Sequence, residues 1–244
     1  YGVNIFKKLK GMWSLAIWDN NNNELILSRD RFGEKPLYYY HENKDIFFGS
    51  QIKQIMNLSK KKFNINEKQI YNFLGLGYRS VEKYNLTFFK GIKKVPSGSY
   101  LKFKLGKIET KKYWTLQYKP NHKTDQKDII NNIRKKVVNA IDRVSVSDVP
   151  LTIMLSGGVD SSIILSALKK KVHTFSLIDK DKRYDESFLI NKTVKLLKVK
   201  NTQITLKHEA SEKLLSKIQD FVDYNSMPMY TITSYVSSKL HSLI

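Results

Sequence analysis

One loop near the middle of the chain constrains the fold more than any other feature. Its seven residues are Ser156-Gly157-Gly158-Val159-Asp160-Ser161-Ser162. A continuous apolar run, residues 151–155, precedes this glycine-rich loop, and apolar residues at helical spacing follow it through residue 168. Short, continuous apolar runs are typical of parallel strands buried on both faces. A glycine-rich turn between such a strand and a helix predicts an α/β fold built on a parallel sheet.

The alternation of strands and helices continues over the second half of the chain. Apolar residues recur at helical spacing over residues 130–144, and further strands are expected at 172–177 and 201–206. Helices are expected between these strands and after them, over 214–222 and finally at Ile232, Val236, Leu240 and Leu243. Such connections favour right-handed crossovers and a parallel sheet covered on both sides. Its ligands would bind beyond the carboxyl ends of the strands.

The first half has a different pattern, short strands joined by turns. Three hairpins are predicted: residues 12–19 with 24–28, residues 36–40 with 45–48, and residues 99–104 with 108–114. The strand at 12–19 has apolar residues on both faces, so it is expected to lie between two layers. Asn66 and Gln69 have the spacing of a capping box and predict a short helix. This half is therefore expected to be α+β, with its tryptophans and tyrosines in the core.

A polar stretch separates the two halves. Residues 117–127 contain Pro120 and have no apolar period, which predicts a domain boundary. We expect a first domain over residues 1–117, a linker over 118–127 and a second domain over 128–244.

The amino-acid composition excludes several classes of protein. The 244 residues include no cysteine, which excludes a disulfide scaffold, a zinc site with cysteine ligands and a cysteine nucleophile within the chain. The five histidines show no metal-ligand spacing. No apolar run approaches the roughly 20 residues of a transmembrane helix. The lack of cysteine fits a reducing cytosol, so a cytoplasmic protein is expected. Tyr1 leads directly into ordinary sequence, so the chain is expected to be a piece of a longer protein.

The net charge of +21, from 43 basic and 22 acidic residues, raises the question of a nucleic-acid partner. The basic residues are spread along the whole chain rather than gathered on one helix or arm. This distribution favours a compositional property of solvated surfaces, so a nucleic-acid partner is not expected.

The glycine-rich loop has the chemistry of an anion site. Glycines let an anion approach the backbone, and the N–H groups at the start of the following helix have no backbone partner. The helix dipole adds partial positive charge there, and the serine hydroxyls are candidate donors to phosphate oxygens. Asp160 is expected either to cap loop N–H groups or to recruit Mg²⁺. No lysine follows as in a Walker loop, so pyrophosphate is the more natural ligand.

The loop resembles the PP-loop of ATP pyrophosphatases, which split ATP into AMP and pyrophosphate. The first half resembles the later part of a class II glutamine amidotransferase domain, on residues 11–19, 29–39, 48–53 and 95–100. Residues 147–150, just before the loop strand, also fit. In this order the two halves resemble the glutamine-hydrolysing asparagine synthetases over essentially the whole chain. The resemblance implies a fold like that of the N-terminal nucleophile hydrolases for the first half and a PP-loop domain for the second.

The resemblance also implies a chemistry. Glutamine would be hydrolysed at an N-terminal cysteine, and its ammonia would pass to the second domain. There ATP, with Mg²⁺, would convert the side-chain carboxylate of aspartate into an acyl-adenylate. Ammonia would then give asparagine, AMP and pyrophosphate. The cysteine would lie upstream of Tyr1 and a second pyrophosphate motif downstream of Ile244, so this chain alone is expected to hold no catalytic residue and no complete site.

By the same resemblance, the ATP- and pyrophosphate-binding residues are Met154, Ser156, Gly157, Gly158, Asp160, Ser161, Ser162 and Leu177. Met154 would meet the nucleotide through its backbone, and Leu177 would lie on the adenine side. Asp185 and Glu186 resemble an acidic pair of the family, although the charge preference of a helix N-terminus explains them equally well. A cluster of charges at Arg29, Asp30, Arg31 and Lys35 is expected to form a structural network at a domain interface.

Two departures leave alternatives open. Gln51 stands where the family usually has Glu, and residues 220–230, near the specificity region, match no version closely. A relative that amidates a sugar-linked carboxylate or closes a lactam ring therefore stays open, as do an RNA-modifying PP-loop protein and a non-catalytic basic binding protein. The expected partners are small molecules: ATP, aspartate and glutamine. No membrane partner is expected, and a homodimer stays open.

Overall fold

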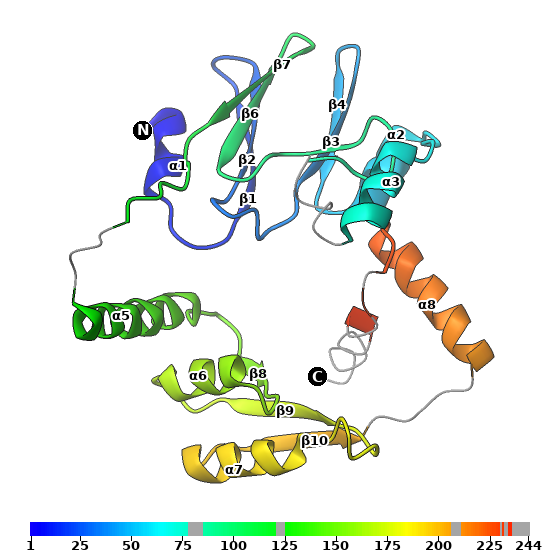
Figure 1. The fold of residues 1–244 in the computed structure, drawn as a ribbon. Helices are drawn as coiled ribbons and strands as arrows, with labels where there is room; N and C mark the ends of the chain where they lie inside the picture. Colours follow the sequence, from blue (N-terminus) through cyan, green and yellow to red (C-terminus); the bar gives the residue numbers. More distant parts are fainter. Residues whose placement is uncertain (78–84, 121–124, 206–210, 230, 232–233, 236–244) are drawn as a thin grey trace. The chain divides into compact units, whose positions relative to one another are not determined.

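The computed structural model describes residues 1–77, 85–120, 125–205, 211–229, 231 and 234–235 (Figure 1). These residues fall into two compact units. The first unit contains residues 1–118 and 214–235, and the second contains residues 119–213. The division into domains expected above stays a prediction.

Two antiparallel sheets form the frame of the first unit. One has the strand order β1-β2-β6-β7 and the other β4-β3-β5. The three predicted hairpins are confirmed, since β1 pairs with β2, β3 with β4 and β6 with β7. The elements are η1 Gly2–Asn4, α1 Ile5–Lys8, β1 Ser14–Asp19, β2 Glu24–Arg29, β3 Tyr38–Glu42, β4 Asp45–Gly49, α2 Ile52–Ser59, α3 Glu67–Leu76, β5 Lys93–Lys94, β6 Ser99–Lys104 and β7 Lys107–Lys112.

Apolar side chains bind these elements into layers. Leu27 of β2 and Leu101 of β6 pack with Tyr39 of β3 between the two sheets. On the other face of the first sheet, Phe6 of α1 packs against Tyr100. A third cluster joins α2 to the outer face of the second sheet. It contains Ile52, Ile55, Ile92, Tyr38, Tyr40 and Phe47.

The prediction that the first strand is buried on both faces is wrong for the described residues. Strand β1 lies at the edge of its sheet, and Ile17 and Trp18 are 40% and 57% exposed. The described residues of the cluster between the sheets come from other strands, such as β2, β3 and β6, and not from β1. The expectation that every tryptophan and tyrosine is core fails here too.

The predicted helix α3 is confirmed, with the Asn66 carboxamide accepting a hydrogen bond from the Gln69 N–H at 3.4 Å. Gln69 is fully buried, whereas Leu74 of the same helix is 75% exposed. Helix α2 was not predicted. It begins with a capping box in which the side chains of Gln51 and Gln54 each accept a hydrogen bond from the other's backbone N–H.

Arg29 and Asp30 organise the turn after β2. The Asp30 carboxylate accepts hydrogen bonds from the N–H groups of Trp13, Phe32, Glu34 and Lys35, at 3.0–3.3 Å. Burial raises the pKa of Asp30, but these four bonds outweigh it and hold the pKa below its ordinary value. The Arg29 guanidinium donates to the carbonyls of Gly33, Lys35 and Val95. Both side chains thus have a structural role within the first unit, while Lys35 is exposed.

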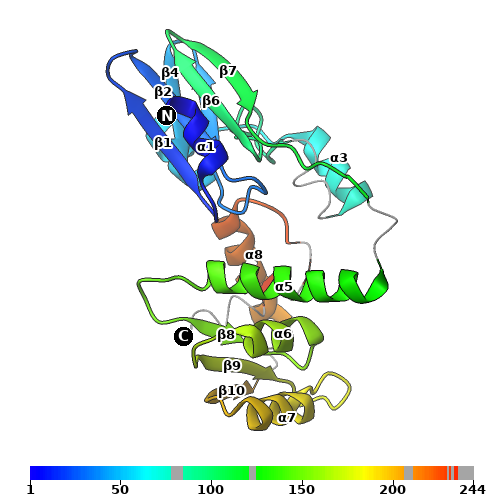
Figure 2. The ribbon, with the colours of Figure 1, turned by 90° about the vertical axis from the view of Figure 1, so that its left-hand side faces the viewer.

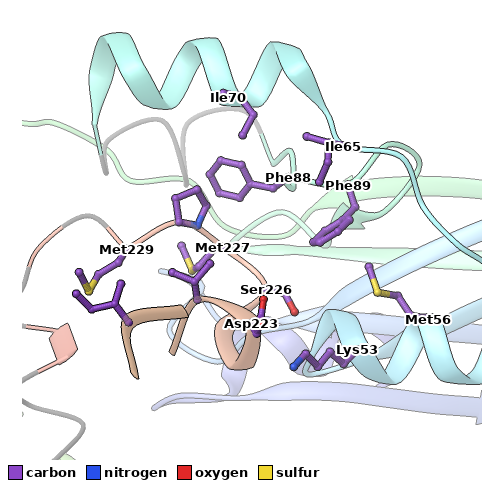
Figure 3. Close-up of a pocket in the computed structure, with 13 residues that line it drawn as sticks. Lys53, Met56, Ile65, Ile70, Phe88, Phe89, Asp223, Ser226, Met227 and Met229 are labelled. Carbon is purple, nitrogen blue, oxygen red and sulfur yellow. The ribbon is translucent and has the colours of Figure 1, made fainter. Parts of the chain in front are cut away.

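A cavity of about 670 Å³ lies in the first unit, next to α8 (Ser211–Asn225). Ile70 of α3 and Phe88 line one side of it, and Val222 of α8 lines another. Figure 3 shows Met227 facing this space and Lys53 at its margin. Residues from late in the sequence therefore line the same cavity as residues that lie about 130 to 175 positions earlier.

The second unit contains a parallel sheet, as predicted. Its order is β10-β9-β8, and both pairings are parallel (Figure 2). The expected last helix at Ile232, Val236, Leu240 and Leu243 lies outside the described residues. The elements are α5 Gln126–Val144, β8 Thr152–Met154, α6 Val159–Ala167, β9 His173–Ile178, α7 Ser187–Leu197 and β10 Asn201–Thr205.

Helices α6 and α7 cover one face of this sheet. Leu165 of α6 and Ile190 of α7 pack with Leu155 and Val172 in one core cluster. Residues of the opposite face, such as Met154 and Leu177, are only half-buried. The sequence predicted helices on both faces of this sheet. In the described part of the chain, helices α6 and α7 cover one face. In that part, no helix is long and apolar enough to cross a membrane.

Candidate phosphate-binding site

The glycine-rich loop joins the carboxyl end of β8 to the first turn of α6. Gly158 is the N-cap residue of α6 but lacks a side chain to cap it. The N–H groups of Val159, Asp160 and Ser161 lie in the first helical turn, where a helix offers no backbone acceptor. No side chain of the described residues caps them. Three donors at the positive end of the helix dipole are thus available to an anion.

The loop serines fold back on the loop. Ser161 Oγ contacts the carbonyls of Ser156 and Gly158 at 3.1 and 3.2 Å, and Ser162 Oγ donates to the Gly158 carbonyl at 2.9 Å. Ser156 Oγ accepts the Gly158 N–H at 3.2 Å. These bonds hold the loop together. That the serine hydroxyls donate to phosphate stays a prediction.

Position 157 requires glycine because α7 lies close to it. Its backbone angles do not require glycine, since neither loop glycine has a positive φ. A Cβ at Gly157 would lie 3.0 Å from Glu186 Cβ and 3.1 Å from Leu189 Cβ. A side chain there would push α7 away from the loop. A Cβ at Gly158 would meet only Ser156 Oγ, at 3.2 Å.

The acidic pair before α7 divides into two roles. Asp185 accepts hydrogen bonds from the N–H and hydroxyl of Ser187, at 2.9 and 3.0 Å. Glu186 instead reaches the loop, and its Oε2 accepts the Gly157 N–H at 3.0 Å. Both carboxylates thus lie at the start of α7, where Glu186 is the N-cap residue, but the Glu186 side chain bonds to the loop rather than to its own helix.

The strand before the loop is held by buried polar groups that the sequence analysis missed. Ser176 Oγ of β9 donates to the Leu155 carbonyl at 2.7 Å, and Asn201 Nδ2 donates to Ser176 Oγ at 3.0 Å. Ser176 is 1% exposed. These bonds fix the residue from which the loop departs. The sequence signal for these groups is the alternation of the polar Thr174 and Ser176 with the apolar Phe175 and Leu177.

Met154 and Leu177 lie on the same face of the sheet. Met154 is the last residue of β8 and pairs with Phe175, and Leu177 lies two residues further along β9. Both are half-buried and point away from the face covered by α6 and α7. The structure thus brings together the two apolar residues expected around a nucleotide base.

The carboxylate at the glycine-rich loop fits a magnesium ion that is held mainly by phosphate oxygens. The Asp160 carboxylate has no hydrogen-bond or ion-pair partner in the described part of the chain and lies in the first turn of α6. Mg²⁺ typically takes one or two carboxylates and completes its shell with phosphate oxygens and water. Among the described residues, no group of three or more His, Cys, Asp or Glu side chains forms a metal cluster. Asp160 is therefore the side chain that would hold such an ion.

Two family models match the chain, one for each half. Residues 1–114 match the glutamine amidotransferase domain, and residues 132–242 match asparagine synthase. The glycine-rich loop lies inside the second match. The chain belongs to the glutamine-hydrolysing asparagine synthetase family. The resemblance stated from the sequence is thereby confirmed.

Members of this family with curated names include a putative asparagine synthetase [glutamine-hydrolyzing] 2 of Methanocaldococcus jannaschii, 32% identical over 95% of this chain and 47% of the relative. Asparagine synthetase [glutamine-hydrolyzing] 2 of Bacillus subtilis is 34% identical over 72% of this chain and 25% of the relative. Amidase chyE of Penicillium rubens is 28% identical over 94% of this chain and 36% of the relative. The chain spans about half, or less, of the length of the relatives it matches.

Proposed function

We propose that the protein transfers ammonia from glutamine to the side-chain carboxylate of aspartate, with cleavage of ATP to AMP and pyrophosphate. The observation that carries this proposal is the glycine-rich loop at the carboxyl end of β8, within a chain that matches both a glutamine amidotransferase domain and asparagine synthase. The two matches supply the two halves of such a reaction, a source of ammonia and a site that activates a carboxylate.

The chemistry requires a leaving group, because a carboxylate is a poor acyl donor. A carboxylate oxygen attacks the α-phosphorus of ATP, the bond to the β-phosphate oxygen breaks, and pyrophosphate leaves. Ammonia then attacks the acyl carbon, loses a proton, and AMP leaves with the carboxylate oxygen. The N–H groups of Val159, Asp160 and Ser161 donate to the departing pyrophosphate, where negative charge develops. When bound at Asp160, Mg²⁺ supplies charge neutralisation.

The nucleotide base would lie against the open face of the parallel sheet. Met154 and Leu177 offer apolar surface on that face, one strand apart and next to the loop. This placement puts the phosphates at the loop and the base over the strand ends, as is usual for ligands of parallel sheets.

Isotope transfer tests the proposed chemistry directly. The intact protein is incubated with glutamine, ATP and aspartate labelled with ¹⁸O in its side-chain carboxylate. Asparagine should form together with AMP that carries one labelled oxygen, because the acyl-adenylate leaves that oxygen on the phosphate. ADP as product, or unlabelled AMP, would reject the acyl-adenylate.

The acceptor is tested in the same assay. Relatives of this chain include proteins named amidases as well as asparagine synthetases, so other carboxylate acceptors are a second candidate. AMP and pyrophosphate formation that fails with aspartate but proceeds, with formation of an amide, when another carboxylate replaces it would favour that candidate. An RNA-modifying or non-catalytic basic protein would instead bind RNA in a salt-dependent manner that is indifferent to changes in the loop.

A further inference from the structure

Glu186 makes a contact that neither the helix it precedes nor the core requires. Its Oε2 accepts the Gly157 N–H at 3.0 Å, whereas α7 receives its capping bonds from Asp185. Glu186 has no side-chain capping bond to its own helix. The carboxylate is therefore directed at the glycine-rich loop rather than at the helix start.

The contact is held in place by close packing. Gly157 lies so near α7 that a Cβ would stand 3.0 Å from Glu186 Cβ and 3.2 Å from Leu189 Cδ1. Leu189 follows Glu186 by one helical turn of α7, and Ile190 beside it is fully buried in the core. The start of α7 is thus fixed against the loop. The Glu186 carboxylate therefore lies within hydrogen-bond distance of the Gly157 N–H.

The contact pairs a negative charge with a donor of an anion-binding loop. Neighbouring N–H groups, those of Val159, Asp160 and Ser161, have no acceptor among the described residues. A phosphate oxygen that approached the Gly157 N–H would meet the Glu186 carboxylate at the same donor. Two anions at hydrogen-bond distance from one N–H repel each other.

We propose that Glu186 is an internal anion for the glycine-rich loop: it holds the Gly157 N–H in the binding geometry and yields that N–H to a phosphate oxygen when nucleotide binds. Glu186 is thus a positioning residue, which keeps the loop formed but opposes the charge of the incoming ligand. The inference rests on the proposed function, because it takes the loop to be the phosphate site.

The test compares Glu186→Gln with Asp185→Asn in the intact protein. Both variants remove one negative charge next to the loop, but only Glu186 contacts Gly157. The glutamine carbonyl can still accept the Gly157 N–H, so the loop keeps its shape while the competing charge is gone. Binding of magnesium-free pyrophosphate, measured by calorimetry, should tighten about tenfold in Glu186→Gln. It should change less than about twofold in Asp185→Asn.

The amide resonance of Gly157 supplies a second measurement. In the wild type, pyrophosphate should shift this resonance strongly, because its acceptor changes from carboxylate to phosphate. An unshifted Gly157 resonance on pyrophosphate binding would overturn the exchange of acceptors. Equal tightening in both variants, or weaker binding of pyrophosphate in Glu186→Gln, would overturn the role of Glu186 while leaving the loop as the phosphate site. Failure of the wild type to bind pyrophosphate and ATP would overturn the proposed site as well.

Discussion

At the scale of single residues, the carboxylate of Asp30 is central to the first unit. It is 1% exposed and accepts four backbone N–H groups. Asp30→Asn turns one acceptor oxygen into a donor that faces N–H groups, so the free energy of unfolding should fall by about 2 to 4 kcal/mol at pH 7. Urea denaturation measures this loss. Asp45→Asn, at an exposed carboxylate, is the matched control and should change little.

The same carboxylate predicts a dependence on pH. Its pKa in the folded protein lies below the ordinary value, so its contribution is complete above the unfolded pKa and is lost as pH falls through the folded pKa. The stability difference between wild type and Asp30→Asn should therefore shrink when denaturation is repeated below pH 4. A difference that stays constant down to pH 2 would contradict this account.

The Tyr113 hydroxyl makes the second residue-scale prediction. It donates to the Arg29 carbonyl at 2.8 Å, and burial raises its pKa to about 12. Tyr113→Phe should lower the free energy of unfolding by about 1 kcal/mol near neutral pH. Because the folded pKa is raised, this contribution is complete below about pH 10 and is lost as pH rises through about 12. Tyr71→Phe, at a side chain 71% exposed, is the control; an equal loss in both variants would refute the role of Tyr113.

At the scale of elements, two glycines should respond to alanine in opposite directions. Gly98, which precedes β6, has φ +60° and its Cβ would lie 2.8 Å from the Trp114 carbonyl oxygen. Gly98→Ala should cost about 2 to 4 kcal/mol through backbone strain and the displaced strand connection. Gly75 lies within α3 with open space around it, so Gly75→Ala should stabilise by up to about 1 kcal/mol. Thermal denaturation of the two variants tests this contrast, and a shift in the same direction for both would contradict it.

At the scale of the whole molecule, α8 links the end of the described chain to the first unit. Val222 lines the same cavity as Ile70 of α3 and Phe88. Val222→Asp places a charge against this apolar wall and should speed hydrogen exchange in α3. Leu215→Asp, on the same helix but 68% exposed, should leave α3 unchanged. Equal exchange in wild type and Val222→Asp would show that α8 does not support this unit.

Much of the fold follows from local signals in the sequence. The hairpins, the parallel strands and the glycine-rich loop were predicted from turn residues and apolar periods, which act over a few neighbouring positions. Helix α2 begins at Gln51, which is not one of the preferred N-cap residues, so its start had no comparable local signal. The exposure of β1 had no local signal in the sequence, because an apolar strand has the same residue pattern in the centre and at the edge of a sheet.

The sequence by itself determined most of the order of the strands and helices, with α2 as an exception, and also the loop between β8 and α6 and the family of the chain. These depend on which residues are neighbours along the backbone. Only the tertiary structure decided what each loop residue does. Gly157 is glycine because α7 packs against it, and Glu186 faces the loop although 29 positions separate the two residues. Such contacts arise from packing between elements, where distance along the chain carries no information about distance in space.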